Sequence, residues 1–327
     1  MGFSIHSRRG FLAGLSGAGI AGSCFGGVAA ALYDAESVVA SVTAGTWDTV
    51  EGRVAHTDGG NLRTVTESST GGLATSGVDV IGPVEAGFDG SDYHVPVVDG
   101  SSNLLLVAAD GSHTTLVSGS ASDAPRGTKS ALATAAWNGH PRSVYYPGSG
   151  TLFRVAPGAS PKRVSEPSNG VKAALGAGDL DGDGTDEFAF VDGSGTVRYI
   201  TPADADSERD IRSTGKSPGS NANFGAGAPV AIDGYGVVLP AVNGSGAVGL
   251  LGPNGWVNKS LTSGSTAKKT AVHGCDFDGD GNVEIVFAGY SNGYLSYLSD
   301  IGGSNDVTTV TDGESDHIPV DPERGVR

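Results

Sequence analysis

The sequence predicts an all-β protein, and composition, turn signals and apolar runs all favour that class. Glycine accounts for 54 of 327 residues, there is one methionine, and no long stretch carries apolar residues at helical spacing. Asp-Gly, Asn-Gly, Ser-Gly and Pro-Gly pairs, which mark turns, recur along the chain. Short apolar runs such as Leu104–Val107 and Val237–Leu239 are typical of buried strands. The chain can therefore build a core from strands.

A Gly-rich turn followed by an apolar residue recurs along the sequence. Its middle residues lie at positions 61, 103, 151, 196, 247 and 294, so successive copies are 42, 48, 45, 51 and 47 residues apart. Repeats of about 40–50 residues, each forming four strands, are typical of a β-propeller. We therefore predict a β-propeller of six four-stranded blades over residues 46–327, with seven blades or an open array as alternatives.

A second feature precedes the last five turns: an apolar residue, then Asp or Asn, then Gly, in a loop between two predicted strands. These loops begin at residues 87, 136, 179, 231 and 276. The first unit lacks such a loop, and the C-terminal segment His317–Asp321 resembles the start of another unit. We predict that this tail supplies the innermost strand of the blade that begins near Thr46. N- and C-terminal strands would then share one blade, and no open sheet edge would remain.

Two of these loops are near-copies with acidic side chains at positions 1, 3, 5 and 9. Clustered carboxylates repel each other unless a hard cation lies among them, and Ca²⁺ takes about six to eight oxygen ligands. The loops are not EF-hands, because position 12 is Phe190 or Phe287 and strand-like apolar residues follow. We predict strand, calcium loop, strand, with two calcium sites; the alternative is an acidic turn whose repulsion is screened by solvent. The acidic candidates are Asp179, Asp181, Asp183 and Glu187 in the first loop, and Asp276, Asp278, Asp280 and Glu284 in the second.

These loops and the strands after them resemble the FG-GAP or VCBS repeats of integrin-type propellers and many secreted microbial proteins. The resemblance extends over roughly residues 80 to 300 and is specific over the two acidic loops. It implies calcium ligation by positions 1, 3, 5 and 9 together with the backbone carbonyl of position 7, which is Thr185 in the first loop and Asn282 in the second. Glu187 and Glu284 depart from the Asp that is usual at position 9, and their extra methylene allows bidentate or water-mediated ligation.

The first 32 residues are expected to direct export. Arg8 and Arg9 precede a glycine-rich apolar segment that reaches Leu32, which is typical of a twin-arginine export signal. Since no charge lies between Phe11 and Leu32, the alternative is a retained membrane anchor. Residues 33–45 form a predicted linker, and Cys275 is expected to be a core residue without a disulfide partner in the exported chain. We expect an extracellular or cell-surface protein.

The chain is strongly acidic, with a formal net charge of −16. Because the first 32 residues carry two arginines and no acid, the remainder holds 18 basic and 36 acidic residues. Such a surface disfavours nucleic acid and anionic membranes as partners. Many acids combined with few lysines resemble the composition of proteins from salt-loving archaea. We expect a halophilic-type monomer whose partner is a protein or a glycan of unknown identity.

The sequence favours a binding protein over an enzyme. Gly289–Gly293 matches the nucleophile-elbow pattern, but it falls on the recurring turn and a strand-like segment follows, so we interpret it as a structural turn. The seven histidines are isolated and form no zinc-ligand pair. Trp47, Trp256, Tyr145 and Tyr146 could stack on sugar rings, although core packing is the simpler interpretation. We predict a non-enzymatic calcium-binding scaffold for binding or adhesion; the alternative is an extracellular lyase-like enzyme acting on polysaccharide, with structural calcium.

Overall fold

The computed structural model describes residues 54–58, 61–65, 70–82, 93–125, 132–202, 211–218, 225–289 and 294–310. All of them belong to one compact unit, Ser41–Arg327. The predicted export signal and linker, Trp47 and the C-terminal tail lie outside the described residues. Within the described ranges, no helix has the length and apolar character needed to cross a membrane.

The described residues form antiparallel strands that group into six sheets. The first sheet contains β1 (Val54–Asp58), β2 (Asn61–Val65) and β3 (Thr70–Ser76), and the second contains β4 (Val78–Ile81), β5 (His94–Asp99), β6 (Leu104–Ala108) and β7 (His113–Val117). The third contains β8 (Ala133–Ala135), β9 (Ser143–Gly148), β10 (Thr151–Val155) and β11 (Lys162–Ser165), and the fourth contains β12 (Val171–Gly178), β13 (Glu187–Asp192), β14 (Val197–Ile200) and β15 (Arg212–Ser213). The fifth contains β16 (Val230–Ile232), β17 (Gly236–Val242), β18 (Val248–Gly252) and β19 (Gly255–Asn258), and the sixth contains β20 (Ala267–Cys275), β21 (Glu284–Gly289), β22 (Leu295–Ser299) and β23 (Asp306–Thr309).

The recurring turn predicted from the sequence joins the second and third strands of every four-stranded sheet, for example β5 to β6 and β13 to β14. The loops that contain the Asp-Gly or Asn-Gly pair join the first and second strands, for example β12 to β13. Within each sheet, consecutive strands pair with each other, so each repeat is an antiparallel meander. The predicted all-β repeat is therefore confirmed.

The predicted number of six four-stranded blades is wrong. Within the described ranges, five sheets have four strands, and the sheet formed by β1–β3 has three. The chain leaves β3 at Ser76 and enters β4, in the next sheet, at Val78, so only Gly77 separates them and no further strand intervenes. Since the recurring turn here joins β1 to β2, β1 matches the second strand of the other sheets, and the strand without a counterpart among the described residues is the first. His317–Asp321, predicted to supply it, lies outside the described residues.

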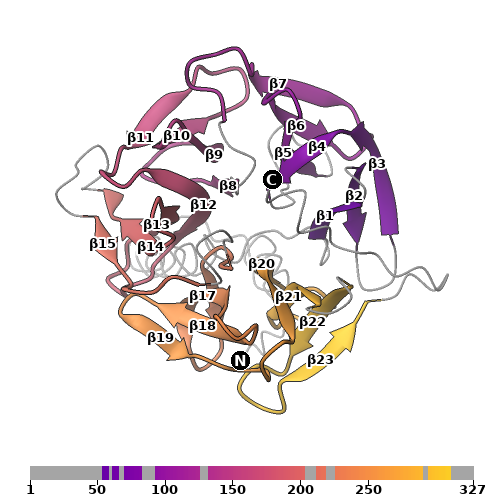
Figure 1. The fold of residues 1–327 in the computed structure, drawn as a ribbon, viewed down its shortest axis with the longest axis vertical. Helices are drawn as coiled ribbons and strands as arrows, with labels where there is room; N and C mark the ends of the chain where they lie inside the picture. Colours follow the sequence, from indigo (N-terminus) through magenta and orange to yellow (C-terminus); the bar gives the residue numbers. More distant parts are fainter. Residues whose placement is uncertain are drawn as a thin grey trace, which may run out of the picture. The chain divides into compact units, whose positions relative to one another are not determined.

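The core lies between the sheets. Each of six clusters of buried apolar side chains combines residues from two sheets that follow one another, and Figure 1 shows these sheets succeeding each other around a ring. The cluster that joins the sixth sheet to the first contains Val54 of β1 together with Phe277 and Tyr297. The ring therefore closes through side-chain packing between the first and last sheets.

Alternation along the strands explains why both faces of each sheet are apolar. In β13, Phe188 and Phe190 pack toward the third sheet, whereas Ala189 and Val191 pack toward the fifth. Successive side chains of a strand point to opposite faces. A strand with a sheet on each side therefore reads as a continuous apolar run rather than as alternating apolar and polar residues.

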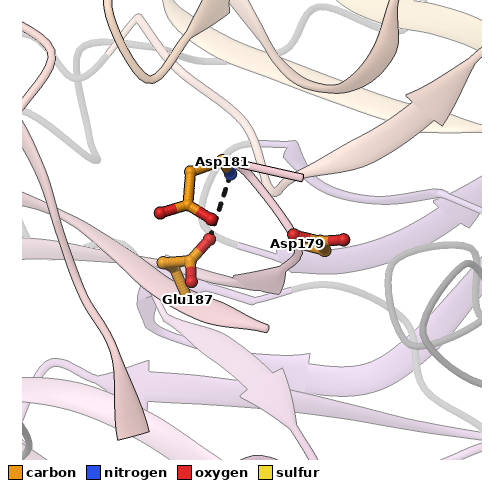
Figure 2. Close-up of side chains that lie close together, drawn as sticks. All are labelled: Asp179, Asp181 and Glu187. Atoms are coloured by element: carbon orange, nitrogen blue, oxygen red, sulfur yellow. Dashed lines mark hydrogen bonds between the residues drawn. The ribbon is translucent and has the colours of Figure 1, made fainter. Parts of the chain in front are cut away.

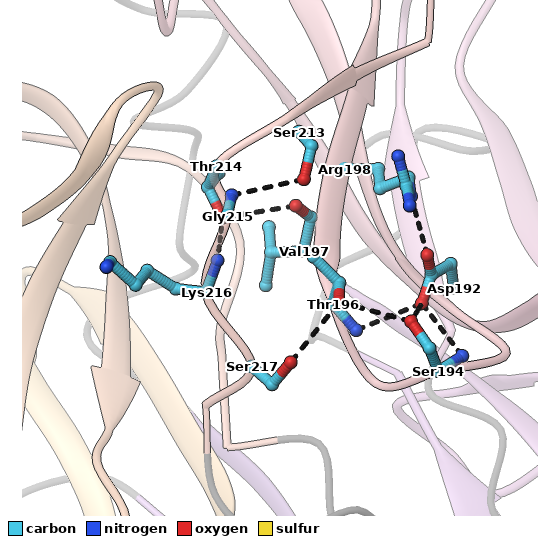
Figure 3. Close-up of polar contacts among 10 residues, drawn as sticks. All are labelled: Asp192, Ser194, Thr196, Val197, Arg198, Ser213, Thr214, Gly215, Lys216 and Ser217. Atoms are coloured by element: carbon cyan, nitrogen blue, oxygen red, sulfur yellow. Dashed lines mark hydrogen bonds and ion pairs between the residues drawn. The ribbon is translucent and has the colours of Figure 1, made fainter.

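The turn between β13 and β14 is held by a buried carboxylate, shown in Figure 3. Oδ1 of Asp192 accepts hydrogen bonds from the backbone N–H of Ser194 (2.9 Å) and Thr196 (3.0 Å), and Oδ2 accepts from Nε of Arg198 (2.5 Å). Burial raises the pKa of this carboxyl, but the hydrogen bonds from Ser194 and Arg198 outweigh burial and hold the pKa below its usual range. The carboxylate stays ionised and fixes the turn.

The same Asx-type turn recurs in two other sheets. Oδ1 of Asp99 accepts from the backbone N–H groups of Ser101 and Asn103, both at 2.9 Å, and Oδ1 of Asn243 accepts from those of Ser245 (2.9 Å) and Ala247 (3.2 Å). Asp and Asn side chains favour such turns because they bond to the backbone two residues ahead. This capping residue is a part of the repeat that the turn pattern alone did not single out.

Candidate metal centre

The two acidic loops occupy equivalent places in the fourth and sixth sheets. The first connects β12 to β13 and the second connects β20 to β21, and the glutamate at loop position 9 is in each case the first residue of the following strand. Glycines at positions 4 and 6 adopt positive φ, with values of 78° at Gly182 and 88° at Gly184. That backbone conformation favours glycine and lets the loop curl around its own side chains. The predicted strand–loop–strand arrangement is confirmed.

Each loop gathers three carboxylates. Atoms of Asp179, Asp181 and Glu187 lie within 4.8 Å of one another, and the grouping is repeated by Asp276, Asp278 and Glu284. Figure 2 shows the first group, with the carboxylates of Asp181 and Glu187 close together and Asp179 beside them. These residues are loop positions 1, 3 and 9. Three like charges at this separation repel one another in the absence of a cation or a proton.

The side chain at position 5 is directed to the loop backbone instead. Oδ1 of Asp183 accepts the N–H of Thr185 at 2.8 Å, and Oδ1 of Asp280 accepts the N–H of Asn282 at 2.7 Å. In the second loop, Nδ2 of Asn282 also donates to Oδ2 of Asp280 at 2.9 Å. Calcium ligation by Asp183 and Asp280, and by the backbone carbonyls of Thr185 and Asn282, stays a prediction.

The glutamate at position 9 ties the start of the loop to the strand that follows it. Oε2 of Glu187 accepts the backbone N–H groups of Leu180 (2.9 Å) and Asp181 (3.2 Å). Oε2 of Glu284 accepts those of Phe277 (2.6 Å) and Asp278 (3.3 Å) in the same way. The longer glutamate at this position can thus reach across the loop, and in Glu187 the second oxygen, Oε1, has no hydrogen-bond partner.

Buried carboxylate oxygens without a hydrogen-bond partner lie at both loops. They are Oε1 of Glu187, on a residue with 0% exposure, and Oδ1 of Asp186 in the first loop, and Oδ1 of Asp276 in the second. Burying a charged oxygen without a donor is costly. A hard cation bound by oxygen ligands removes that cost, and the all-oxygen donor set of each loop suits Ca²⁺. The residues present therefore fit a calcium ion.

The pKa values of the two glutamates reflect the same cost of burying charged carboxylates close together. Burial raises the pKa of Glu187 and of Glu284 to about 7 each; backbone hydrogen bonds within each loop oppose that shift, and the neighbouring aspartates add to it. Asp186, at position 8 of the first loop, has its pKa raised to about 6 by burial and by Asp179. Without a cation, the loops hold protons close to neutral pH, and a cation would displace them.

The structure also places the other residues considered from the sequence. Tyr145 and Tyr146 are fully buried, and Trp256 packs against the cluster between the fourth and fifth sheets, so the core-packing interpretation is confirmed for all three. Cys275 is a buried free thiol, as predicted. Gly289 ends β21 and Leu295 begins β22, so a strand follows the elbow-like pattern, whose residues 290–293 lie outside the described residues.

Two residues outside the loops also bear on the first site. Nε1 of Trp137 donates a hydrogen bond to the backbone carbonyl of Asp186 at 2.7 Å. The guanidinium of Arg212 forms an ion pair with Oδ2 of Asp181. Sequence reasoning missed both contacts because each partner comes from a different part of the chain. Trp137 did carry a signal, since it occupies the apolar position of the equivalent loop in the third sheet.

Comparison with known proteins defines the class of fold. No protein-family model and no curated protein matches the chain. Among solved structures, the chain is similar to a fucose-specific lectin from Aleuria aurantia (17% identity, 82% of this chain and 94% of that one, TM-score 0.51). It is also similar to AofleA from Arthrobotrys oligospora (12% identity, 79% and 86%, TM-score 0.51).

A virginiamycin B lyase from Staphylococcus aureus is a more distant match (12% identity, 82% of this chain and 87% of that one, TM-score 0.45). Identities this low show the fold alone. The two matches with a TM-score of 0.51, together with the sheet order and the inter-sheet core, establish an all-β β-propeller.

Proposed function

We propose that this chain is a calcium-binding β-propeller of the FG-GAP or VCBS type that serves as a non-enzymatic binding or adhesion scaffold outside the cell. The observation that carries the proposal is the buried Oε1 of Glu187, which has no hydrogen-bond partner and belongs to a group of three carboxylates. The second loop repeats the group and has its own unpartnered oxygen on Asp276. Two such groups at equivalent places favour bound cations over a coincidence of acidic residues.

When bound, calcium would supply positive charge that compensates the carboxylates and links the loop to its strand. Asp179, Asp181 and Glu187 would hold it in the first loop, and Asp276, Asp278 and Glu284 in the second. Glu187 and Glu284 also hold the loop backbone through Oε2, so their ionised form organises the loop in advance. The sites then stabilise two sheets of the ring and leave the exposed loops to contact a protein or glycan partner.

Thermal unfolding of the full chain, with calcium and with a chelator at low salt, tests the calcium sites. A ligand that binds only the folded state stabilises it by about 2.7 kcal/mol at a hundredfold excess over its Kd. That corresponds to a rise of roughly 5–10 °C in the unfolding midpoint for a domain of this size. The variant Glu187→Gln should lose part of the shift, whereas Glu166→Gln, at an exposed surface glutamate, should keep all of it. A midpoint that is the same with calcium and chelator would refute the sites.

Export and binding need tests of their own. Replacing Arg8 and Arg9 by lysines should keep the protein inside the cell if the twin-arginine signal operates. Glycan-array binding by the full chain, without cleavage of the bound polysaccharide, would support the scaffold. Calcium-dependent depolymerisation of a polysaccharide would favour the lyase-like alternative.

A further inference from the structure

The positively charged side chain of Arg212 lies at the first acidic loop. Nη1 of Arg212, in β15, forms an ion pair with Oδ2 of Asp181, one of the three grouped carboxylates. The Asp181 side chain is 20% exposed and that of Arg212 is 48% exposed, so the pair lies at the rim of the loop. Arg212 is also the residue of β15 that pairs with Tyr199 of β14.

Among the described residues, no basic side chain forms an ion pair with the second loop. Tyr199 pairs with Ala189, which lies two residues after Glu187, and Tyr297 pairs with Val286, two residues after Glu284; the two tyrosines are therefore equivalent. The residue opposite Tyr297 on the outer strand is Thr308, at the place that Arg212 takes in the fourth sheet. Among the ion pairs of the described residues, none involves Asp278.

We propose that Arg212 is an internal counter-cation that competes with calcium for Asp181, so that the first loop binds calcium more weakly than the second. The inference rests on the proposed calcium sites and concerns their difference. To ligate calcium fully, Asp181 must release the guanidinium or share its carboxylate with it. Sharing places a divalent ion beside a fixed positive charge, which is unfavourable at this separation.

The first loop is nevertheless a site and not simply a neutralised turn. Arg212 pairs with Asp181 and leaves Oε1 of Glu187, on the other side chain of the group, buried without a partner. One guanidinium compensates one of three negative charges. The competition therefore lowers calcium affinity without abolishing it, and the two sites fill over different calcium ranges.

The competition also couples calcium to the edge of the fourth sheet. β15 is a strand of two residues, Arg212 and Ser213, and it pairs only with β14 among the described strands. The ion pair adds a link from this short strand to the loop between β12 and β13. Calcium bound at the first loop would replace the ion pair between Arg212 and Asp181 with contacts between the ion and the grouped carboxylates. Occupancy of the weaker site thereby changes how the outer edge of this sheet is held.

Calcium titration calorimetry of the full chain tests the proposal one site at a time. The first loop is measured in a Glu284→Gln background and the second in a Glu187→Gln background. Arg212→Gln should tighten binding at the first loop by up to about fivefold, which is about 1 kcal/mol, the upper value for a partly exposed ion pair. Thr308→Arg should weaken the second loop by a similar factor. Arg212→Lys, which keeps the charge, should stay close to the parent.

Arg163→Gln is the matched control, because it removes one positive charge in the third sheet, where Arg163 pairs with the exposed Glu166 and not with a loop carboxylate. It should leave both affinities unchanged. If Arg212→Gln and Arg163→Gln tighten the first loop equally, the effect is one of net charge and the counter-cation role is refuted. If the parent chain binds no calcium, or if Asp179→Asn and Asp276→Asn leave its calcium binding unchanged, the proposed function itself has failed. If both loops bind calcium and Arg212→Gln changes nothing, only the role of Arg212 has failed.

Discussion

The indole Nε1 of Trp137 donates a hydrogen bond to the backbone carbonyl oxygen of Asp186, 2.7 Å away and 49 residues further along the chain. Trp137 lies between β8 and β9, so this bond joins the third sheet to the first acidic loop of the fourth. The ring of Trp137 also contacts Phe188 and Tyr145, at centroid distances of 5.5 Å and 6.4 Å. The loop of the third sheet, which lacks the acidic side chains, thus supports the acidic loop of the fourth sheet.

Replacement of Trp137 by phenylalanine should therefore affect one acidic loop more than the other. The change keeps an aromatic ring in the core and removes the donor to Asp186, which should lower the free energy of unfolding by about 1 kcal/mol. Calcium affinity should fall at the first loop and stay unchanged at the second, as measured by calorimetry in the single-loop backgrounds. Trp256→Phe in the fifth sheet is the control, and equal losses at both loops would contradict the contact's local role.

Two equivalent glycines provide a matched pair for backbone packing. Gly193 follows Asp192 and Gly244 follows Asn243 in the same recurring turn. A Cβ added at Gly193 would lie 1.7 Å from the carbonyl oxygen of Asn169, whereas one added at Gly244 would meet nothing within 4 Å. Gly193→Ala should therefore cost at least about 2 kcal/mol in denaturant unfolding, because the backbone must shift. Gly244→Ala should stay within about 0.5 kcal/mol; equal costs would contradict the close approach.

The hydroxyl of Tyr146 offers a test of polar burial. It is fully buried, has no hydrogen-bond partner, and its pKa is raised by burial. Tyr146→Phe removes an unsatisfied group and keeps the stacking on Phe153, whose ring lies 5.7 Å away. Stability in denaturant should stay the same or rise by about 1 kcal/mol. Tyr146→Leu, which removes the ring, should destabilise, and a large loss from Tyr146→Phe would reveal a partner for the hydroxyl.

The raised pKa values of Glu187 and Glu284, about 7 in place of the ordinary 4.5, predict an unusual pH dependence. Between pH 4.5 and 7 the folded protein holds protons on these glutamates that the unfolded chain has released. The contribution of the two groups to the free energy of unfolding is therefore fully present below pH 4.5 and is lost as the pH rises through 7. In chelator, the contribution of these groups should lower the unfolding midpoint over this window. Calcium binds the ionised form, so the stabilisation it adds should grow with pH over the same window.

Thermal scans from pH 5 to 7.5, with and without calcium, measure both trends. The Glu187→Gln, Glu284→Gln double variant carries no titrating group at these positions and should show a flatter profile in chelator. A chelator profile that is as steep in the double variant as in the parent would assign the pH dependence to other groups.

The repeat, its turns and the two acidic loops could be predicted from the sequence because each is a local pattern. Glycine and Asp-Gly spacing marks turns, apolar runs mark strands buried on both faces, and carboxylates at alternate loop positions converge because the loop is short. The same reasoning predicted six four-stranded blades, and it failed at β1–β3, where the described residues contain no counterpart of the first strand. The tail predicted to supply that strand, His317–Asp321, lies outside the described residues.

Contacts between distant parts of the chain were decided by the tertiary structure. The packing of Val54 against the sixth sheet, the bond from Trp137 to Asp186, and the pairing of Arg212 with Asp181 each join residues that no local pattern relates. Whether Oε1 of Glu187 meets water or is buried depends in the same way on the sheets around it. Local spacing sets which elements form, because turn and strand preferences act over a few residues. Side-chain environment depends on which strands become neighbours in the ring, and that depends on packing over the whole unit.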